Sequence, residues 1–210
     1  RSTLFPYTTL FRSSIDDDMN EIKIILIGEP GTGKTCLINV ATGNQFNENS
    51  ESTLLSTYVT KNMVINDKEY SLNLWDTAGQ EKYRAMTKIF TKNSKIVIFV
   101  YAINNKNTFE EMKSYWIKTI KETLGDEPIL GIAGNKSDLY LEEAVPEEEA
   151  REFANKLGIK FKLVSAKNDP NSFVNFLQEL VEEFLKTKGI SAKNGINLNK
   201  QKKKKSGCCS

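Results

Sequence analysis

The sequence lacks long apolar runs and has few cysteines. No stretch approaches the roughly 18 consecutive apolar residues that a transmembrane helix needs, and no charged and apolar leader opens the chain. Of the three cysteines, Cys208 and Cys209 are adjacent at the C-terminus and Cys36 lies in an expected helix, so no disulfide framework is available. These absences predict a protein that is made and folded in the cytosol.

The main part of the chain also lacks a basic character. The net charge is +2, but residues 188–210 hold seven lysines and no acid, which leaves a net charge of −5 for the rest. A nucleic-acid-binding body would carry basic residues with interleaved aromatics, so we expect no nucleic-acid partner. A terminal lysine run suits an anionic membrane surface instead.

Glycines cluster in the segment Gly28–Thr35, which reads Gly-Glu-Pro-Gly-Thr-Gly-Lys-Thr. This segment lies between the apolar run 22–27, a candidate buried strand, and a candidate helix that ends at Gly43. Glycines let the backbone wrap an anion, and a helix N-terminus adds about half a positive charge. The pattern predicts a phosphate-binding loop, with Lys34 on the β and γ phosphates and the hydroxyl of Thr35 on Mg²⁺. A glycine-rich turn formed by chance is the alternative.

The rest of the chain alternates strand and helix patterns around one β-hairpin, whose turn is expected at Asn66-Asp67. The expected strands are 22–27, 58–65, 70–75, 96–101, 129–133 and 160–164. The expected helices end at Gly43, Gly125, Gly158 and Lys186, with Pro146 at the first helical position of the third and Asp169-Pro170 capping the fourth. These 210 residues suffice for one α/β core. We predict a P-loop NTPase fold, with a mostly parallel six-stranded sheet, one antiparallel hairpin strand and helices on both faces.

Four motifs fall at the carboxyl ends of expected strands, where ligands bind in such sheets. Besides the phosphate loop they are 76–80, 135–138 and 165–167. Asp76 is expected to hold Mg²⁺ through a water, the N–H of Gly79 to meet a γ-phosphate oxygen, and Gln80 to orient a water.

The base-reading set is expected to be Asn135, Lys136 and Asp138. A carboxylate at Asp138 can accept hydrogens from N1–H and the exocyclic amine of guanine, whereas adenine presents an acceptor at N1. The set therefore predicts guanine. An ATPase or a nucleotide kinase is the alternative, and a strong preference for GDP over ADP would separate the two.

With these motifs in order, the chain resembles a Ras-superfamily small GTPase, most of all the Rab family, over residues 22–187 and the tail. The resemblance implies that 44–56, a polar stretch without a clean period, is switch I, and that residues from 76 to about 90 are switch II. The motifs and the resemblance together assign to the guanine nucleotide Gly31, Thr32, Gly33, Lys34, Thr35, Cys36, Phe46, Thr53, Gly79, Asn135, Lys136, Asp138, Ser165, Ala166 and Lys167. They assign Thr35, Thr53 and Asp76 to Mg²⁺, and Gln80 to catalysis.

The resemblance implies a molecular timer that binds GTP and hydrolyses it to GDP. Thr53 and Gly79 hold the switches only while a γ-phosphate is present. No residue is an obvious arginine finger, so GTP hydrolysis by the protein alone should be slow. A GTPase-activating protein should accelerate it about 10³- to 10⁵-fold. The other implied partners are an exchange factor, effectors, a prenylation escort and a GDP-dissociation inhibitor. Trp75 is either part of an exposed effector surface or a partly buried strand-end residue.

Four positions depart from the family pattern, and one of them, Ala102 in place of a frequent aspartate after the fourth strand, carries no functional conclusion. Pro30 stands where the family usually has a small residue; nucleotide binding should survive because the phosphate donors follow it, but we expect weaker helper-stimulated hydrolysis. Ser50 replaces a frequent tyrosine and Leu55 a usual glycine, so effector identity cannot be carried over. A nucleotide-locked binding module remains an alternative, whereas a Ras- or Rho-type signalling switch is disfavoured by Trp75 and by the absence of a C-a-a-X box.

The two ends of the chain are expected to lie outside the GTPase domain, which we place at 19–187. Residues 1–18 are interpreted as a non-native or disordered extension, with a natural start near Met19. Residues 188–210 are expected to form a flexible tail, with a polar linker at 189–199 and then a run of lysines. Cys208 and Cys209 resemble the Rab signal for double geranylgeranylation, which would let a cytoplasmic protein cycle to an intracellular membrane. A solvated lysine tail with two incidental thiols is the alternative.

Overall fold

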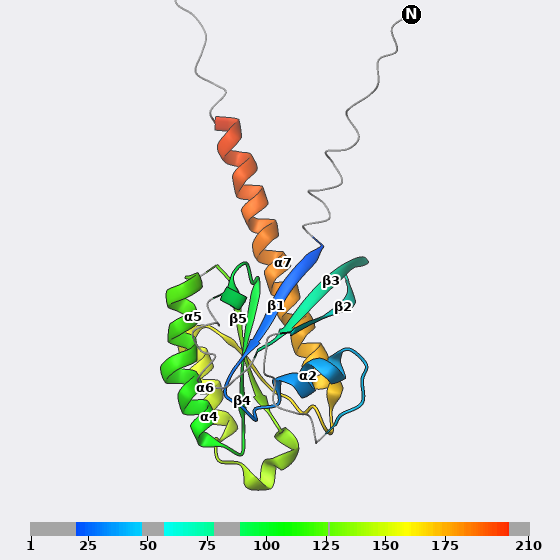
Figure 1. Cartoon of the computed structure of the whole chain (residues 1–210). Coiled ribbons are helices and arrows are strands. Elements are labelled where there is room, and N and C mark those ends of the chain that lie inside the picture. The colour runs from blue at the N-terminus through cyan, green and yellow to red at the C-terminus, as the bar shows by residue number, and fades with distance from the viewer. Residues whose placement is uncertain (1–19, 48–56, 78–88, 126, 202–210) are drawn as a thin grey trace, which may run out of the picture.

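Six strands form one sheet in the order β2-β3-β1-β4-β5-β6, and only the β2–β3 pair is antiparallel (Figure 1). The computed structural model describes residues 20–47, 57–77, 89–125 and 127–201. The strands are β1 (Glu21–Ile27), β2 (Thr57–Ile65), β3 (Lys68–Asp76), β4 (Ile96–Ala102), β5 (Ile129–Asn135) and β6 (Lys160–Leu163). The helices are α2 (Lys34–Ala41), α4 (Lys106–Glu111), α5 (Ile117–Leu124), α6 (Glu147–Leu157) and α7 (Pro170–Gln201). The predicted sheet is confirmed.

The central strand β1 is buried on both faces, because helices cover the sheet from both sides. Ile22, Ile24 and Leu26 pack into one apolar cluster with residues of α2 and α7. Ile25 and Ile27 pack into a second cluster with residues of α4, α5 and α6. Successive residues of a strand point to opposite faces, so a continuous apolar run is what this position requires. The end of β1 is thereby fixed in the middle of the molecule.

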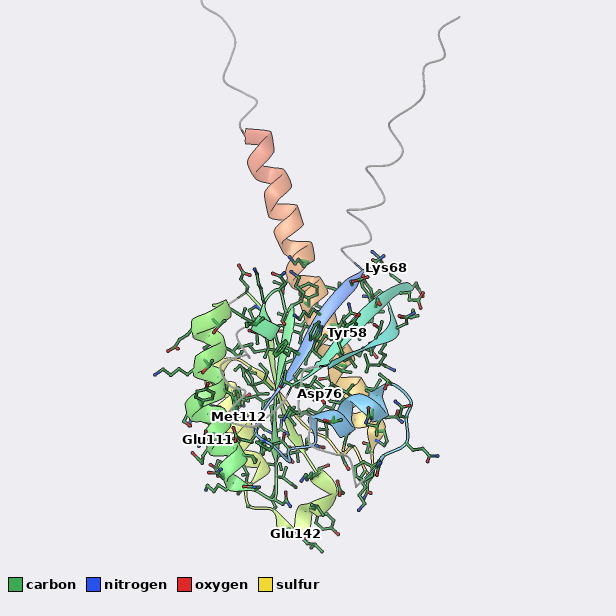
Figure 2. The ribbon with its side chains drawn as sticks, in the orientation of Figure 1. Tyr58, Lys68, Asp76, Glu111, Met112 and Glu142 are labelled. Carbon is green, nitrogen blue, oxygen red and sulfur yellow. The ribbon has the colours of Figure 1, made fainter. Side chains whose placement is uncertain are left out.

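The hairpin turn forms where the sequence predicts it. Asn66 and Asp67 both have positive φ values, 51° and 60°, and Ile65 pairs with Lys68 across the turn. Two consecutive residues of positive φ define the turn type that matches the twist of two antiparallel strands, and Asn and Asp tolerate it well. The turn lies near the labelled Lys68 in Figure 2, away from Asp76 at the other end of β3.

Most helix ends also agree with the predicted signals. Gly125 and Gly158 close α5 and α6 with positive φ values of 63° and 66°. The backbone N–H of Ser172 donates to the carboxylate of Asp169 at 3.2 Å, which caps α7. Pro146 lies one position earlier than predicted, as the N-cap of α6, because its ψ of 138° is extended rather than helical. The prediction of Pro146 as the first helical residue is wrong.

Three features of the helices were not predicted. The helix expected to end at Gly125 is interrupted by a π-helical turn, η2 (Met112–Trp116), and a 3₁₀ segment, η3 (Ser137–Glu142), follows β5. α7 continues to Gln201, so the polar linker predicted at 189–199 is wrong. Each residue added to an existing helix gains one backbone hydrogen bond, and this stretch contains no proline to stop it. Among the described residues, no helix is both long and apolar enough to cross a membrane.

The hairpin turn generates a stability prediction. We expect Asp67→Val to lower the free energy of unfolding by about 1 to 2 kcal/mol, because a β-branched residue is strained at positive φ. Asp67→Gly, the matched control, adopts this conformation without strain and should leave stability within about 0.5 kcal/mol of the original. Urea denaturation of the full-length variants measures both values, and an equal loss in the two variants would contradict the explanation.

Candidate nucleotide-binding site

The glycine-rich segment between β1 and α2 folds as a tight turn. Gly31 and Gly33 have φ values of 73° and 88°, and Gly33 is the N-cap of α2. Positive φ is the region that glycine enters without steric cost, so the chain can curl here and direct successive amides to one side. The N-terminus of α2 adds further backbone amides at the same place. The geometry is that of an anion-binding loop.

Gly33 also permits a close approach to the end of β5. A Cβ atom on Gly33 would lie 2.3 Å from Nδ2 of Asn135, which is too close for any side chain. Nδ2 of Asn135 donates to the carbonyl of Thr32 at 2.8 Å, and Oδ1 accepts from the N–H of Ala166 at 3.4 Å. Asn135, predicted to read the base, therefore uses both amide atoms to tie the phosphate loop to the segment that follows β6.

Lys34 is buried beneath the loop, and its ammonium group is held by backbone carbonyls. Nζ donates to the oxygen of Gly28 at 2.9 Å and to that of Glu29 at 3.0 Å. Burial lowers the pKa of Lys34 to about 8, while the carboxylates of Asp76 and Glu29 oppose this and favour the charged form. The ammonium group of Lys34, removed from water and beneath the backbone amides of the loop, is suited to attract a polyanion.

Two metal-ligand candidates lie together, Thr35 in the first turn of α2 and Asp76 at the end of β3. Oγ1 of Thr35 donates to Oδ2 of Asp76 at 2.7 Å, and β1 and β3 are adjacent parallel strands. A hydroxyl and a carboxylate are hard oxygen donors, which Mg²⁺ takes together with phosphate oxygens. Thr35 and Asp76 therefore fit the predicted ion, which would neutralise phosphate charge. The third predicted ligand, Thr53, lies outside the described residues.

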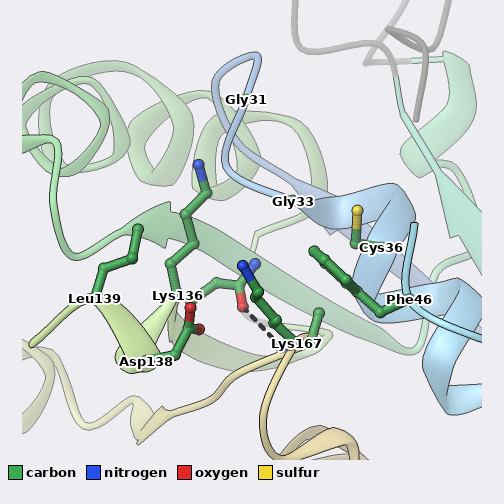
Figure 3. A pocket seen from close by; sticks show the side chains of 10 residues that line it. Gly31, Gly33, Cys36, Phe46, Lys136, Asp138, Leu139 and Lys167 are labelled. Carbon is green, nitrogen blue, oxygen red and sulfur yellow. Dashed lines mark hydrogen bonds between the residues drawn. The ribbon is translucent and has the colours of Figure 1, made fainter. Parts of the chain in front are cut away.

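A pocket of 310 Å³ opens beside the phosphate loop (Figure 3). In Figure 3, Phe46 lies on one side of this pocket, and Lys136, Asp138 and Leu139 lie on the other. Oγ of Ser165 donates to Oδ1 of Asp138 at 2.5 Å, which fixes the orientation of the carboxylate. The lining residues are Gly31, Gly33, Cys36, Phe46, Asn135, Lys136, Asp138, Leu139, Ala166 and Lys167. An apolar ring on one side and an oriented carboxylate on the other suit a purine base.

The structure brings most of the predicted residues into one site. Those at its centre come from the loop after β1, the end of β3, and the segments after β5 and β6. Gly79, Gln80 and Thr53 lie outside the described residues, as do the tail cysteines Cys208 and Cys209 and the extension 1–18. Their predicted roles stay predictions.

Two contacts at this site were missed by sequence reasoning. Leu139, which follows Asp138 within η3, also lines the pocket. Glu29 accepts a hydrogen bond from Trp116, 87 residues away. Leu139 follows the predicted motif directly and could have been included, whereas no sequence signal links Glu29 to Trp116.

A phosphate loop between a central strand and a helix, with an acidic residue ending the adjacent strand, defines a nucleotide-binding protein of the P-loop class. The Ras family model matches residues 23–186. The chain therefore belongs to the Ras family, and its curated relatives are of the Rab type.

Three relatives illustrate the similarity. The chain is 36% identical to the Ras-related protein SEC4 of Saccharomyces cerevisiae over 197 residues, which cover 90% of this chain and 91% of the relative. It is 36% identical to the Ras-related protein RabC of Dictyostelium discoideum, over 89% and 96% of the two chains. It is 41% identical to the Ras-related protein Rab-21 of Geodia cydonium over 145 residues, which span 69% of this chain and 63% of that protein.

Proposed function

We propose that this protein is a Rab-type small GTPase that binds GTP, hydrolyses it to GDP, and changes conformation to regulate vesicle trafficking at an intracellular membrane. The observation that carries the proposal is the pocket in which the carboxylate of Asp138, oriented by Ser165, faces the ring of Phe46 next to the phosphate loop. Relatives named as Rab proteins support the cellular role.

Guanine selectivity follows from the chemistry of Asp138. An ionised carboxylate only accepts hydrogen bonds, and guanine presents two donors, N1–H and the exocyclic amine, side by side. Adenine places an acceptor at N1, which would leave a carboxylate oxygen facing a lone pair. Because the hydroxyl of Ser165 already occupies Oδ1, the carboxylate cannot rotate freely to avoid the mismatch.

The proposed hydrolysis depends on positioning and on charge stabilisation. Lys34 is proposed to neutralise β- and γ-phosphate charge, and Thr35 and Asp76 are proposed to hold the Mg²⁺ that shares this task; the burial of Lys34 and the hydrogen bond between Thr35 and Asp76 support these roles. Thr53 is proposed as a further Mg²⁺ ligand, Gly79 as a γ-phosphate donor, and Gln80 as the residue that orients the attacking water. Release of the γ-phosphate would then relax both switches.

The proposed cycle places the protein in the cytoplasm and, through its tail, on the cytosolic face of a membrane. Two geranylgeranyl chains on Cys208 and Cys209 would anchor it, since a single lipid gives only marginal binding. Each of the lysines at 202–205 would add about 1 kcal/mol to the free energy of binding to an anionic membrane leaflet. An exchange factor, a GTPase-activating protein, effectors, a prenylation escort and a GDP-dissociation inhibitor are the partners proposed for this cycle.

The first prediction concerns base selectivity. With Mg²⁺ present, calorimetry should show tight binding of GDP and at least about 100-fold weaker binding of ADP. Asp138→Asn should lower the affinity for GDP and raise the affinity for xanthosine diphosphate. Xanthine has a carbonyl where guanine has its exocyclic amine, and the amide N–H of asparagine can donate to that carbonyl. Asp67→Asn makes the same chemical change at the hairpin turn and should leave both affinities unaltered. Equal affinity of the unmodified protein for GDP and ADP would refute guanine selectivity.

The second prediction concerns Pro30, an exposed residue of the phosphate loop. Pro30→Gly should accelerate single-turnover GTP hydrolysis in the presence of a Rab GTPase-activating protein by about tenfold, on the hypothesis that the rigid proline ring hinders the catalytic Gln80 or an incoming arginine. GDP affinity should change by less than about threefold, because the amides that follow Pro30 remain. Pro146→Gly, at the exposed start of α6, is the matched control. Equal stimulated rates in Pro30→Gly and the unmodified protein would exclude this role of the proline.

The third prediction concerns the tail. In eukaryotic cells, Cys208→Ser combined with Cys209→Ser should move the tagged protein, with its C-terminus left free, from the membrane pellet to the soluble fraction. Ser206→Ala combined with Ser210→Ala is the control, which keeps both cysteines and should stay in the pellet. Persistent pelleting of the cysteine variant would show that the lipid anchor is not what holds the protein.

A further inference from the structure

Trp116 ends the π-helical turn η2 between α4 and α5, in the helical segment that covers the face of the sheet opposite to α2 (Figure 1). Its indole Nε1–H donates to Oε1 of Glu29 at 2.8 Å. Trp116 is only 1% exposed, and Glu29 is half-buried. This contact joins residues 87 positions apart and connects a buried helix residue to the loop proposed to bind phosphate.

The π-helical turn η2 sets the position of Trp116. The N–H of Ile117 bonds to the carbonyl of Met112, five residues back, so the helix is widened by one residue at this point. Both Trp116 and Ile117 are buried, and the ring of Tyr115 packs edge-on against the indole at 4.9 Å. π-turns are uncommon and frequently lie at functional sites. Here the widened turn ends on the residue that contacts the loop.

The main chain of Glu29 contacts other residues of the phosphate loop. Its carbonyl oxygen accepts from Nζ of Lys34 at 3.0 Å and from Oγ1 of Thr32 at 2.9 Å. The side chain of Glu29 is thus held by the helix while its backbone helps to hold the buried ammonium group. Restraining the side chain also restrains the carbonyl, because both belong to one residue in a tight turn.

The charge of Glu29 makes this restraint necessary. A carboxylate in an anion-binding loop repels a polyphosphate if it turns toward the bound ligand. A hydrogen bond from a buried donor is directional, so the indole keeps the carboxylate on the helix side of the loop. The charge then stays near Lys34, where it stabilises the ammonium group, and away from the phosphates.

We propose that Trp116 is a positioning residue for nucleotide binding, which acts through the side chain of Glu29 to fix the loop carbonyls that aim Lys34 at the phosphates. Trp116 is proposed to act on the phosphates only through Glu29. This inference rests on the proposed function, since it assigns a task within the same site.

The test is a double-mutant cycle on the release of tritiated GDP from the full-length protein with Mg²⁺, measured by filter binding. Trp116→Phe keeps an apolar ring but loses the donor, and Glu29→Leu loses the acceptor. Each should accelerate GDP release about tenfold, and the double variant should be no faster than either single one, because both remove the same hydrogen bond. Glu29→Gln keeps an acceptor oxygen and should release GDP within about threefold of the original rate.

Two further measurements separate positioning from general stability. In a Trp75→Phe background Trp116 is the only tryptophan, so its indole N–H gives a single NMR signal. The chemical shift of this proton should move upfield in Glu29→Leu and stay nearly unchanged in Glu29→Gln. Ile120→Val, a buried change on the same helical segment, should lower stability without altering GDP release.

The inference would be overturned if the single variants release GDP at the original rate. It would also be overturned if the acceleration in the double variant equals the product of the two single accelerations. Either result would leave the proposed function intact. Failure of the unmodified protein to bind GDP would instead refute the proposed function.

Discussion

The buried ammonium group of Lys34 is the charge on which the candidate site depends. It lies beneath the phosphate loop and is held by two backbone carbonyls of that loop. Removing a cation from water is unfavourable, and this lowers the pKa of Lys34 to about 8. The neighbouring carboxylates of Asp76 and Glu29 compensate in part. A buried cation that backbone carbonyls hold in one place is suited to an anion, because a preorganised binding site gains affinity.

The sheet supplies the rigidity that this arrangement needs. Because β1 is buried on both faces, the loop that follows it cannot shift without disturbing two apolar clusters. A Cβ atom on Gly28 would lie 2.1 Å from the carbonyl oxygen of Val100, so the loop begins in direct backbone contact with β4. One strand further along the sheet, Asn135 ties the carbonyl of Thr32 to the end of β5. Three neighbouring strands thus determine the shape of one loop.

Membership of the Ras family accounts for the order of the motifs, and two further residues of the loop, Glu29 and Pro30, act beside them. Pro30 adds a rigid ring to the exposed part of the loop. Glu29 adds a negative charge, which Trp116 holds by a hydrogen bond from a buried helix. These two neighbours lie outside the glycine and lysine positions that define the loop, so they can alter its behaviour while the phosphate-binding geometry is kept.

The sequence by itself determined the sheet, the hairpin turn at Asn66-Asp67 and the loop at Gly28–Thr35, because each depends on a local pattern of apolar residues, glycines or turn formers. It did not determine the π-turn at Met112–Trp116 or the continuation of α7 to Gln201, since helical spacing and polarity alone do not fix where a helix widens or stops. Only the tertiary structure assigned Asn135 to the phosphate loop and joined Trp116 to Glu29. Hydrogen bonds between segments distant in sequence arise from packing, and packing leaves no periodic signal in the chain.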